Sequence, residues 1–484
     1  MNRTIMSTYK QYVFWFAQEH VPFRKPEILS LIKLFNIKPR TIEKICDETP
    51  YWIIELDDEK HCHDICSRSV SVRFCMELWS RSKIIKEFHE RLQKYVNTNS
   101  DCQKYFSASN TFRITVETYN KHFTQAEKIK KIENLEYIPV KGSVKLTNPD
   151  IEYMYYEHYG LDSNNVPEQP LEILFGRYIC SGQRQLKKEL SLKSRKFIGN
   201  TSMDATLSVL AANQALAQDG KIIMDPFVGS GSLLVAAAKF GGYVMGMDID
   251  YLMLHGRTRP SRIKQKTRDK DESILANLKQ YQCESSYLDV VVADSSLPLW
   301  RPNFKIDAIV TDPPYGIREA TERIGTDQSL KRTPDSTDST DFDHFPAKID
   351  YDLPQLYSDL LQLAATHLSP GGRLVCWFPV FRKDYDESFL PKHKQLSLIA
   401  NSEQVLSNHT SRRMLTYEKL PEDSQVNDDF DDSSTTAVLE YRHKYFVHSE
   451  GTRKEKRLKR HEEQERTKMD KIKARFEKKI NNLL

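Results

Sequence analysis

The chain has 484 residues and a mass of 56.5 kDa, with 39% hydrophobic and 29% charged residues, which leaves room for two or three domains and excludes a single small binding module. No stretch approaches the roughly 18 apolar residues of a membrane span, and the N-terminus lacks the pattern of a secretion signal. The formal net charge is only +4, and the eight scattered cysteines are typical of free thiols in the cytosol or nucleus.

The first part of the chain alternates strand and helix patterns. Runs of β-branched and aromatic residues predict strands at residues 9–17, 50–57, 69–77, 111–117 and 143–147. Apolar residues at helical spacing predict helices at residues 23–37, 80–96 and 124–134. We therefore expect an α+β region over residues 1–170, without a catalytic constellation of its own.

One short segment of this region raises the question of a metal site. The sequence "HCHDIC" at residues 61–66 places two His and two Cys in six positions, and Cys-x3-Cys spacing is permissible for zinc. No second ligand pair follows at the expected distance. We therefore favour a surface turn with ordinary buried thiols and expect no metal.

The pattern changes after residue 170. Residues 171–200 are rich in Lys and Arg and read as a basic linker, after which Asn200, Thr201 or Ser202 can cap a helix of Ala and Leu. Short apolar runs then alternate with helical stretches, and they predict strands at residues 221–226, 243–249, 287–294, 306–312 and 373–379. This alternation predicts a mostly parallel, doubly wound α/β sheet over residues 201–450.

Three further segments lie outside this pattern. Residues 327–345 and 421–436 are rich in Ser, Thr and Asp, so we expect mobile loops there. Residues 451–484 hold 13 Lys or Arg against 6 Asp or Glu. Such a basic tail is either a solvated helix or a clamp on phosphates.

Glycines and carboxylates follow the first two strands of the expected sheet. Gly229 and Gly231 form a turn where the backbone can approach a ligand, and Asp248 ends the second strand, where it can accept hydrogen bonds from ribose hydroxyls. A dinucleotide does not fit, because position 234 holds Leu234 instead of the third glycine and Asp225 would repel a pyrophosphate.

An acid before the turn suits a ligand that carries an ammonium group. S-adenosylmethionine has an amino-acid end, a ribose and an adenine. We therefore expect Asp225 near its amine, Asp248 on its ribose and Asp294, at the end of the third strand, on its adenine amino group.

The stretch "IVTDPPYG" at residues 309–316 ends the fourth strand and indicates the acceptor. An exocyclic amine of a nucleobase is a poor nucleophile, because its lone pair is delocalised into the ring. Asp312 and the carbonyl of Pro313 can accept its N–H groups. Tyr315 and Pro314 can hold the extruded ring. We interpret the stretch as a site of methyl transfer to a base amine.

These residues resemble a known family. The stretches "DPFVGSG", "GMDID", "ADSS" and "TDPPYG", preceded by "RKFIGNTSMDATLS", look like the eukaryotic tRNA guanosine N2-methyltransferases that modify position ten. These are class I methyltransferases with an N-terminal THUMP domain, and "SVKLTNPDIEYMYYEHYG" resembles its closing strands. The resemblance implies a Rossmann-like methyltransferase domain after a THUMP-containing region that binds tRNA, with S-adenosylmethionine as cofactor.

The resemblance further implies a small zinc-binding activator subunit as partner and a cytoplasmic location. In this fold the third strand, residues 287–294, lies at a sheet edge, where its apolar residues would need cover. Two alternatives remain open. One is an amino-methyltransferase that acts on DNA, another nucleic acid or a protein; the other is a tRNA-binding scaffold without catalysis.

Overall fold

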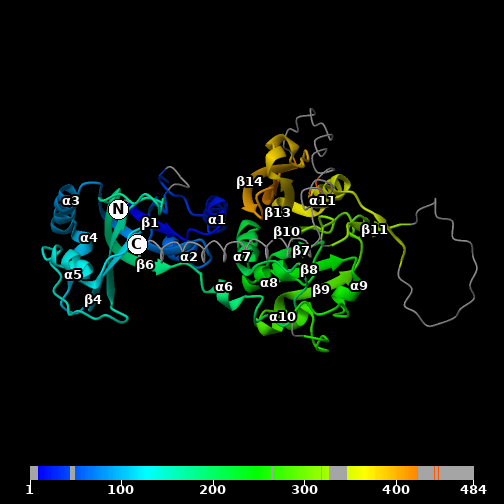
Figure 1. The fold of residues 1–484 in the computed structure, drawn as a ribbon, viewed down its shortest axis with the longest axis horizontal. Coiled ribbons are helices and arrows are strands. Elements are labelled where there is room, and N and C mark those ends of the chain that lie inside the picture. Colours follow the sequence, from blue (N-terminus) through cyan, green and yellow to red (C-terminus); the bar gives the residue numbers. More distant parts are fainter. Residues whose placement is uncertain are drawn as a thin grey trace, which may run out of the picture.

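The structure of the chain is a computed structural model that describes residues 9–43, 49–262, 265–317, 319–325 and 346–422, together with Tyr441 and Tyr445. Over these residues the chain forms two lobes, each built on its own sheet, which lie side by side along the long axis of the molecule (Figure 1). The basic tail at residues 451–484, the insert at 327–345 and all but the first two residues of the insert at 421–436 fall outside the described residues.

The first lobe holds a six-stranded sheet in the order β2-β1-β3-β6-β5-β4. β4 and β5 pair in parallel, and the other neighbours are antiparallel. The strands are β1 (Lys10–Phe16), β2 (Tyr51–Leu56), β3 (Val72–Ser82), β4 (Phe112–Tyr119), β5 (Ile151–His158) and β6 (Glu172–Ser181). The helices are α1 (Arg24–Leu34), α2 (Lys60–Cys66), α3 (Ile85–Thr98), α4 (Ser100–Gln103) and α5 (Gln125–Glu133).

The predicted strands at 9–17, 50–57 and 111–117 and the helices at 23–37 and 124–134 are confirmed. The strand predicted at 143–147 is wrong: only Val144 makes an isolated bridge there, and Val144 and Leu146 are 66% and 72% exposed. The helix predicted to begin at residue 80 begins at Ile85, because β3 continues to Ser82.

The first sheet extends past the expected boundary at residue 170. β6 lies between β3 and β5 in the middle of this sheet, so the first ten residues after Leu171 belong to the first lobe and not to a linker. Residue patterns did not predict β6, and β5 was expected only from the resemblance of residues 143–160 to the closing strands of a THUMP domain, because both faces of each strand are covered. In β5, Tyr155 packs into one core cluster and its neighbour Tyr156 into another, on opposite faces of the strand.

The segment at residues 61–66 is helix α2, not the expected turn. Cys62 and Cys66 lie four residues apart on it, and both pack into a core cluster that also contains Cys75. Within the described ranges, no group of three or more His, Cys, Asp or Glu residues is placed to hold a metal ion.

The second lobe holds a seven-stranded sheet in the order β14-β15-β13-β10-β7-β8-β9. Neighbours from β13 to β9 pair in parallel, and β14 and β15 are antiparallel additions at one edge. The strands are β7 (Ile222–Asp225), β8 (Tyr243–Asp248), β9 (Tyr287–Val292), β10 (Ile306–Thr311), β13 (Leu368–Phe381), β14 (Leu396–Val405) and β15 (Thr410–Lys419); β11 (Glu322–Ile324) and β12 (Lys348–Asp350) pair separately. The mostly parallel α/β sheet is thereby confirmed, whereas β14 and β15 were not expected.

Helices pack around the second sheet. They are α6 (Leu186–Glu189), α7 (Ala205–Gln214), α8 (Ser232–Lys239), α9 (Tyr251–Leu254), α10 (Ile274–Gln280) and α11 (Leu353–His367). The expected cap of α7 at residues 200–202 is wrong: the Asp204 side chain accepts from the backbone N–H groups of Thr206 and Leu207. Residues 199–203 instead line a cavity. Among the described residues, no helix is long and apolar enough to cross a membrane.

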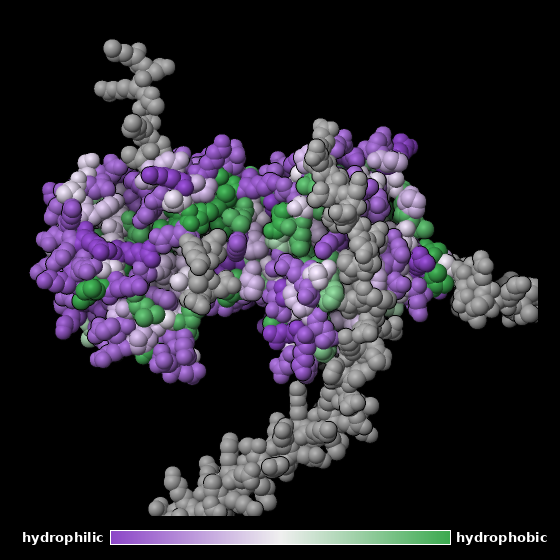
Figure 2. Space-filling model, turned by 90° about the horizontal axis from the view of Figure 1, so that it is seen from above, coloured by the Kyte–Doolittle hydropathy of each residue, from purple (hydrophilic) through white to green (hydrophobic). Residues whose placement is uncertain are grey.

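The two lobes share a packed interface. α1 of the first lobe lies against α7 of the second (Figure 1). Glu27 of α1 is fully buried and accepts hydrogen bonds from Ser69 Oγ, from two backbone N–H groups and, at 2.9 Å, from Nδ2 of Asn213 in α7. Phe23 packs into the core of the second lobe. Seen from above, hydrophilic side chains cover most of both lobes (Figure 2).

Candidate active site

A cavity of about 850 Å³ lies at the carboxyl ends of the parallel strands of the second sheet. Because those ends meet at one edge, residues far apart in the sequence come together there. Eight of the nine residues singled out from the sequence line the cavity: Asp225, Gly229, Asp248, Asp294, Asp312, Pro313, Pro314 and Tyr315. The ninth, Gly231, lies between two residues of the cavity wall.

The turn from β7 to α8 requires its two glycines for different reasons. Gly229 has φ 49° and Gly231 has φ 75°, a region that side chains with a Cβ rarely adopt. A Cβ on Gly229 would meet no heavy atom within 4 Å, whereas a Cβ on Gly231 would lie 2.8 Å from Cγ2 of Ile274. Gly229 therefore leaves open space at the cavity, and Gly231 lets α8 pack closely.

Asp225, at the end of β7, is 2% exposed. Its Oδ1 accepts from the Thr311 hydroxyl at 2.7 Å and from the backbone N–H of Phe227 at 3.0 Å. The pKa of Asp225 is raised to about 7, chiefly by burial and in addition by the charges of Asp248 and Asp312. A cationic ligand group beside Asp225 would stabilise its ionised form.

Asp248 is the last residue of β8, and Asp294 lies two residues after the end of β9. Asp248 accepts from the backbone N–H of Gly229 at 2.8 Å and of Asp250 at 2.9 Å, and burial raises its pKa. Asp294 accepts from the backbone N–H of Ser296 at 2.9 Å and of Ile324 at 2.6 Å. Both carboxylates are thus held in fixed orientations at the cavity wall and retain lone pairs for a ligand.

Asp312 follows β10 and has a partner for each of its oxygens. Oδ1 accepts from the Tyr315 hydroxyl, and Oδ2 accepts from Nη1 of Arg412 at 3.0 Å. Burial raises the pKa of Asp312, and the charge of Arg412 opposes that shift. Burial also raises the pKa of Tyr315 well above its usual value, so its hydroxyl stays a neutral donor.

Arg412 is the main residue of the cavity that the sequence does not reveal. It projects from β15, its Nε donates to Oε1 of Gln404 at 2.7 Å, and its guanidinium lies 4.1 Å from the ring centroid of Trp377. These contacts hold the guanidinium beside Asp312. The "SRRML" stretch that contains Arg412 has two adjacent arginines and no strand-like run of apolar residues, which is why β15 was not expected.

The cavity wall also includes two segments that were not expected to contribute site residues. One is residues 199–204, where the hydroxyls of Ser202 and Ser230 lie 2.6 Å apart. The other contributes the rings of Tyr441 and Tyr445. Their aromatic faces add apolar surface to a wall that otherwise contains many carboxylates.

Comparison with known proteins gives matches over both lobes. Residues 10–184 match the Tmrp11 THUMP N-terminal domain, and residues 193–332 match the RMKL-like methyltransferase domain. The tRNA (guanine(10)-N(2))-methyltransferase TRMT11 of Gallus gallus is 44% identical, over 85% of this chain and 88% of that protein. TRMT11 of Homo sapiens is 43% identical, over 85% of this chain and 89% of that protein.

A solved structure is similar at a lower level. TrmN from Thermus thermophilus aligns with a TM-score of 0.42 at 17% identity and covers 85% of this chain and 100% of that chain.

Proposed function

The chain belongs to the family of tRNA (guanine(10)-N(2))-methyltransferases named TRMT11, and we propose from this premise that it methylates the N2 amine of a guanosine in tRNA, at position 10. The observation on the chain's own residues that supports this activity best is the carboxylate of Asp312 beside Tyr315, in the same cavity as Asp225 and Asp248. This places a base-binding motif next to residues suited to a nucleoside cofactor.

The residues of the cavity fit S-adenosylmethionine, which supplies the methyl group. Asp225, a buried carboxyl at the cavity wall, suits the ammonium group of the cofactor, whose positive charge would favour the ionised carboxylate against the effect of burial. Asp248 suits the ribose hydroxyls and Asp294 the adenine amino group, and the open space at Gly229 lets the ligand approach the backbone. The cofactor thus has a partner for each of its three parts.

The acceptor amine is bound by the motif at residues 312–315. Asp312 and the carbonyl of Pro313 accept its two N–H groups, which draws the lone pair out of conjugation with the ring and leaves Asp312 placed to take the proton. Tyr315 and Pro314 hold the ring, and both line the cavity. Positioning and charge placement supply the acceleration.

Arg412 keeps Asp312 in its ionised form, the form that accepts hydrogen bonds. A buried carboxyl without a compensating charge takes up a proton more readily and becomes a donor. The guanidinium 3.0 Å from Oδ2 opposes this. Arg412 is therefore a positioning residue that acts through Asp312.

The first lobe binds the tRNA. We assign residues 1–170 and the strand β6 to this THUMP-containing region. The rest of the range up to residue 200, which begins after Ser181, is a basic connection, and residues 201–450 form the methyltransferase domain. The match of residues 10–184 to a THUMP N-terminal domain supports this division. The buried interface between α1 and α7 holds the tRNA-binding lobe at a fixed position relative to the cavity.

A small zinc-binding activator subunit pairs with strand β9. This strand is the edge of the second sheet, and its Leu288, Val291 and Val292 are 50%, 40% and 45% exposed. An uncovered apolar edge strand is a site for pairing with another chain. We assign the complex to the cytoplasm, which fits the free cysteines among the described residues.

The test is transfer of labelled methyl from S-adenosylmethionine to unmodified tRNA, with and without the activator subunit, followed by nucleoside analysis. We expect N2-methylguanosine at one position. Asp312→Asn should lower turnover at least about 100-fold, because it removes the charged acceptor, while binding of S-adenosylhomocysteine stays nearly unchanged. Asp307→Asn is the matched control: Asp307 lies in β10, the strand before Asp312, and pairs with Lys221 outside the cavity wall.

Other outcomes separate the alternatives. Methylation of duplex DNA or of a protein, but not of tRNA, would indicate a different amine substrate. Binding of tRNA and cofactor without transfer under either condition would indicate a scaffold. Substantial turnover by Asp312→Asn would remove Asp312 from the catalytic role.

A further inference from the structure

The segment between α9 and α10 is rich in basic residues. The proposed function assigns no role to it. Residues 257–270 contain seven Lys or Arg and one acidic residue, Asp269. Arg259, Lys266 and Lys270 are exposed, whereas Arg262 and Arg268 are partly buried. The two groups of cations therefore have different tasks.

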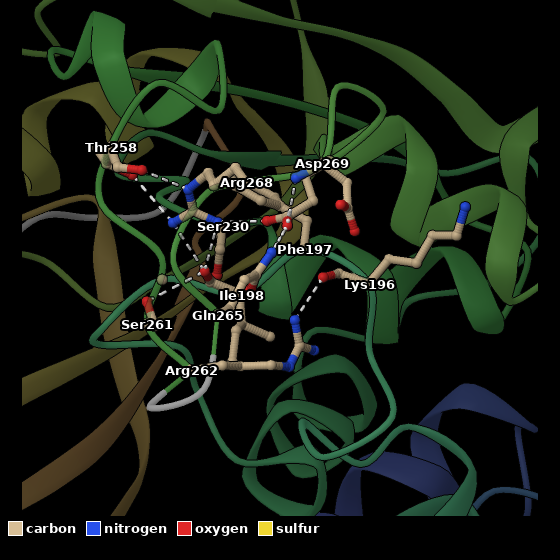
Figure 3. A network of polar contacts seen from close by, with 12 residues as sticks. Lys196, Phe197, Ile198, Ser230, Thr258, Ser261, Arg262, Gln265, Arg268 and Asp269 are labelled. Atoms are coloured by element: carbon tan, nitrogen blue, oxygen red, sulfur yellow. Dashed lines mark hydrogen bonds and ion pairs between the residues drawn. The ribbon is translucent and has the colours of Figure 1, made fainter.

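Arg268 fixes the shape of this segment. Its guanidinium donates to the carbonyls of Thr258 and Ile198 at 2.7 and 3.3 Å, and it pairs with Glu272 at 2.6 Å, where both side chains are about 5% exposed. Figure 3 shows the arginine directed inward between the loop and residues 196–198. A loop pinned by a buried, multiply bonded arginine presents its exposed side chains in defined positions.

The network also attaches the loop to the cavity wall. Arg262 donates to the backbone carbonyls of Arg195 and Lys196, and Ser261 donates to that of Ile198 (Figure 3). The chain continues from there into residues 199–204, which line the cavity. The loop thus follows Asp250 and Met253 of the cavity wall and is bonded to the residues that lead into its other segment, residues 199–204.

The exposed cations have few internal partners. Lys196 pairs with Asp271 at 2.7 Å, and so compensates one acidic group at the end of the segment. Over the residues that the structure describes, no ion pair is formed by Arg259, Lys266 or Lys270. Their charge is directed to the solvent, where a polyanion can meet it.

We infer that Arg259, Lys266 and Lys270 bind backbone phosphates of the tRNA next to the nucleotide whose base enters the cavity. This rests on the proposed function. An extruded nucleotide keeps its flanking phosphates outside the base pocket, at its rim. Contacts to these phosphates position the strand without reading its sequence. The loop is thus a second tRNA contact, separate from the first lobe.

The experiment uses the full chain with its activator subunit and the triple variant Arg259→Gln, Lys266→Gln and Lys270→Gln. The dissociation constant for tRNA is measured over a range of salt concentrations. Loss of three phosphate contacts should reduce the slope of log affinity against log salt by about two. The dissociation constant at low salt should rise at least about tenfold, while kcat at saturating tRNA changes less than about twofold.

The matched control replaces three other exposed lysines by glutamine: Lys305, Lys392 and Lys394. Lys305 precedes β10, and the other two precede β14, so all three lie away from the carboxyl ends where the cavity opens. This variant should keep the salt slope of the wild type. Binding of S-adenosylhomocysteine shows that each variant is folded.

The outcomes distinguish the two proposals. A wild-type chain that does not methylate tRNA contradicts the proposed function. An active wild type together with a triple variant of unchanged salt slope and affinity overturns the inference about the loop. The three single variants test the inference in the same way. Each should reduce the salt slope by roughly one third of the reduction in the triple variant.

Discussion

Arg412 and Asp312 form an ion pair at the wall of the cavity, and this pair sets the charge that faces a bound base. Burial raises the pKa of Asp312, and the guanidinium 3.0 Å away opposes the shift. Ionised Asp312 accepts N–H groups, whereas protonated Asp312 donates. Binding of the methyl-accepting amine to Asp312 therefore depends on Arg412, although the amine need not touch Arg412.

Arg412→Gln should move the acidic limb of the pH profile of kcat/KM to higher pH. Without the guanidinium, burial acts unopposed and the pKa of Asp312 rises further, so the carboxylate is lost at a higher pH as the pH falls. A shift of roughly one to three units is expected, because that is the range over which a neighbouring arginine lowers the pKa of an aspartate. In Arg412→Lys, which keeps a positive charge, the acidic limb should lie between those of the wild type and Arg412→Gln.

The control for this measurement is Arg413→Gln. Arg413 is the next residue of β15, but its guanidinium lies over Tyr385, 3.6 Å from the ring centroid, and does not line the cavity. Its pH profile should match that of the wild type. An unchanged acidic limb in Arg412→Gln would contradict the role of Arg412.

The sequence was sufficient to locate the carboxylates but not the arginine. Asp225, Asp248 and Asp294 each lie at or just after the carboxyl end of a strand, and the geometry of parallel sheets brings such strand ends together. Arg412 reaches the cavity from an antiparallel strand. Its place depends on a register, Cys376 opposite Leu415 and Pro379 opposite Arg412, that no local pattern specifies.

At the level of elements, the turn between β7 and α8 combines two constraints. Gly231 is close to Ile274 of α10, so this glycine joins two helices. Gly229 faces open space at the cavity. Gly231 thus serves packing, and Gly229 leaves room for a ligand.

Alanine at these two glycines should therefore have separable effects. Gly231→Ala should lower the free energy of unfolding by roughly 2–3 kcal/mol, from backbone strain and from the displacement of Ile274. Gly229→Ala should cost only about 1 kcal/mol but weaken binding of S-adenosylhomocysteine more strongly. Denaturant unfolding and calorimetric binding measure the two quantities. Equal effects of both variants on both quantities would contradict this division.

The elements that the sequence did not predict share a physical cause. β6 is covered on both faces, and β14 and β15 are rich in polar residues, so none of the three shows the apolar alternation of a half-buried strand. Residues 143–147 alternate well, but they are exposed and make only one bridge, from Val144 to the first residue of β4. Whether these segments form strands therefore depends on pairing with strands that are distant in the sequence.

At the level of the whole molecule, Glu27 joins the two lobes. It is fully buried and accepts hydrogen bonds from its own lobe and from Asn213, 186 residues away. Arg373 of the second sheet adds a hydrogen bond of 2.9 Å to Ser30 of α1. No sequence pattern connects these positions, because the contact exists only once both lobes have folded.

Glu27→Ala should lower the free energy of unfolding by about 3 kcal/mol or more, because it leaves several buried donors without an acceptor. Urea denaturation measures this loss. Glu90→Ala, an exposed position on α3, should stay within about 0.5 kcal/mol of the wild type. A loss in Glu27→Ala no larger than that of the control would mean that the interface contributes little.

The buried contact between α1 and α7 has a consequence for inheritance. A gene broken between the lobes would yield one product with Glu27 lacking its partner and another with the Phe23 site of its core vacant. Neither product would be well folded until it met the other. The two lobes must therefore be inherited together, on one chain or on two, whereas loops that touch neither this interface nor the cavity can vary.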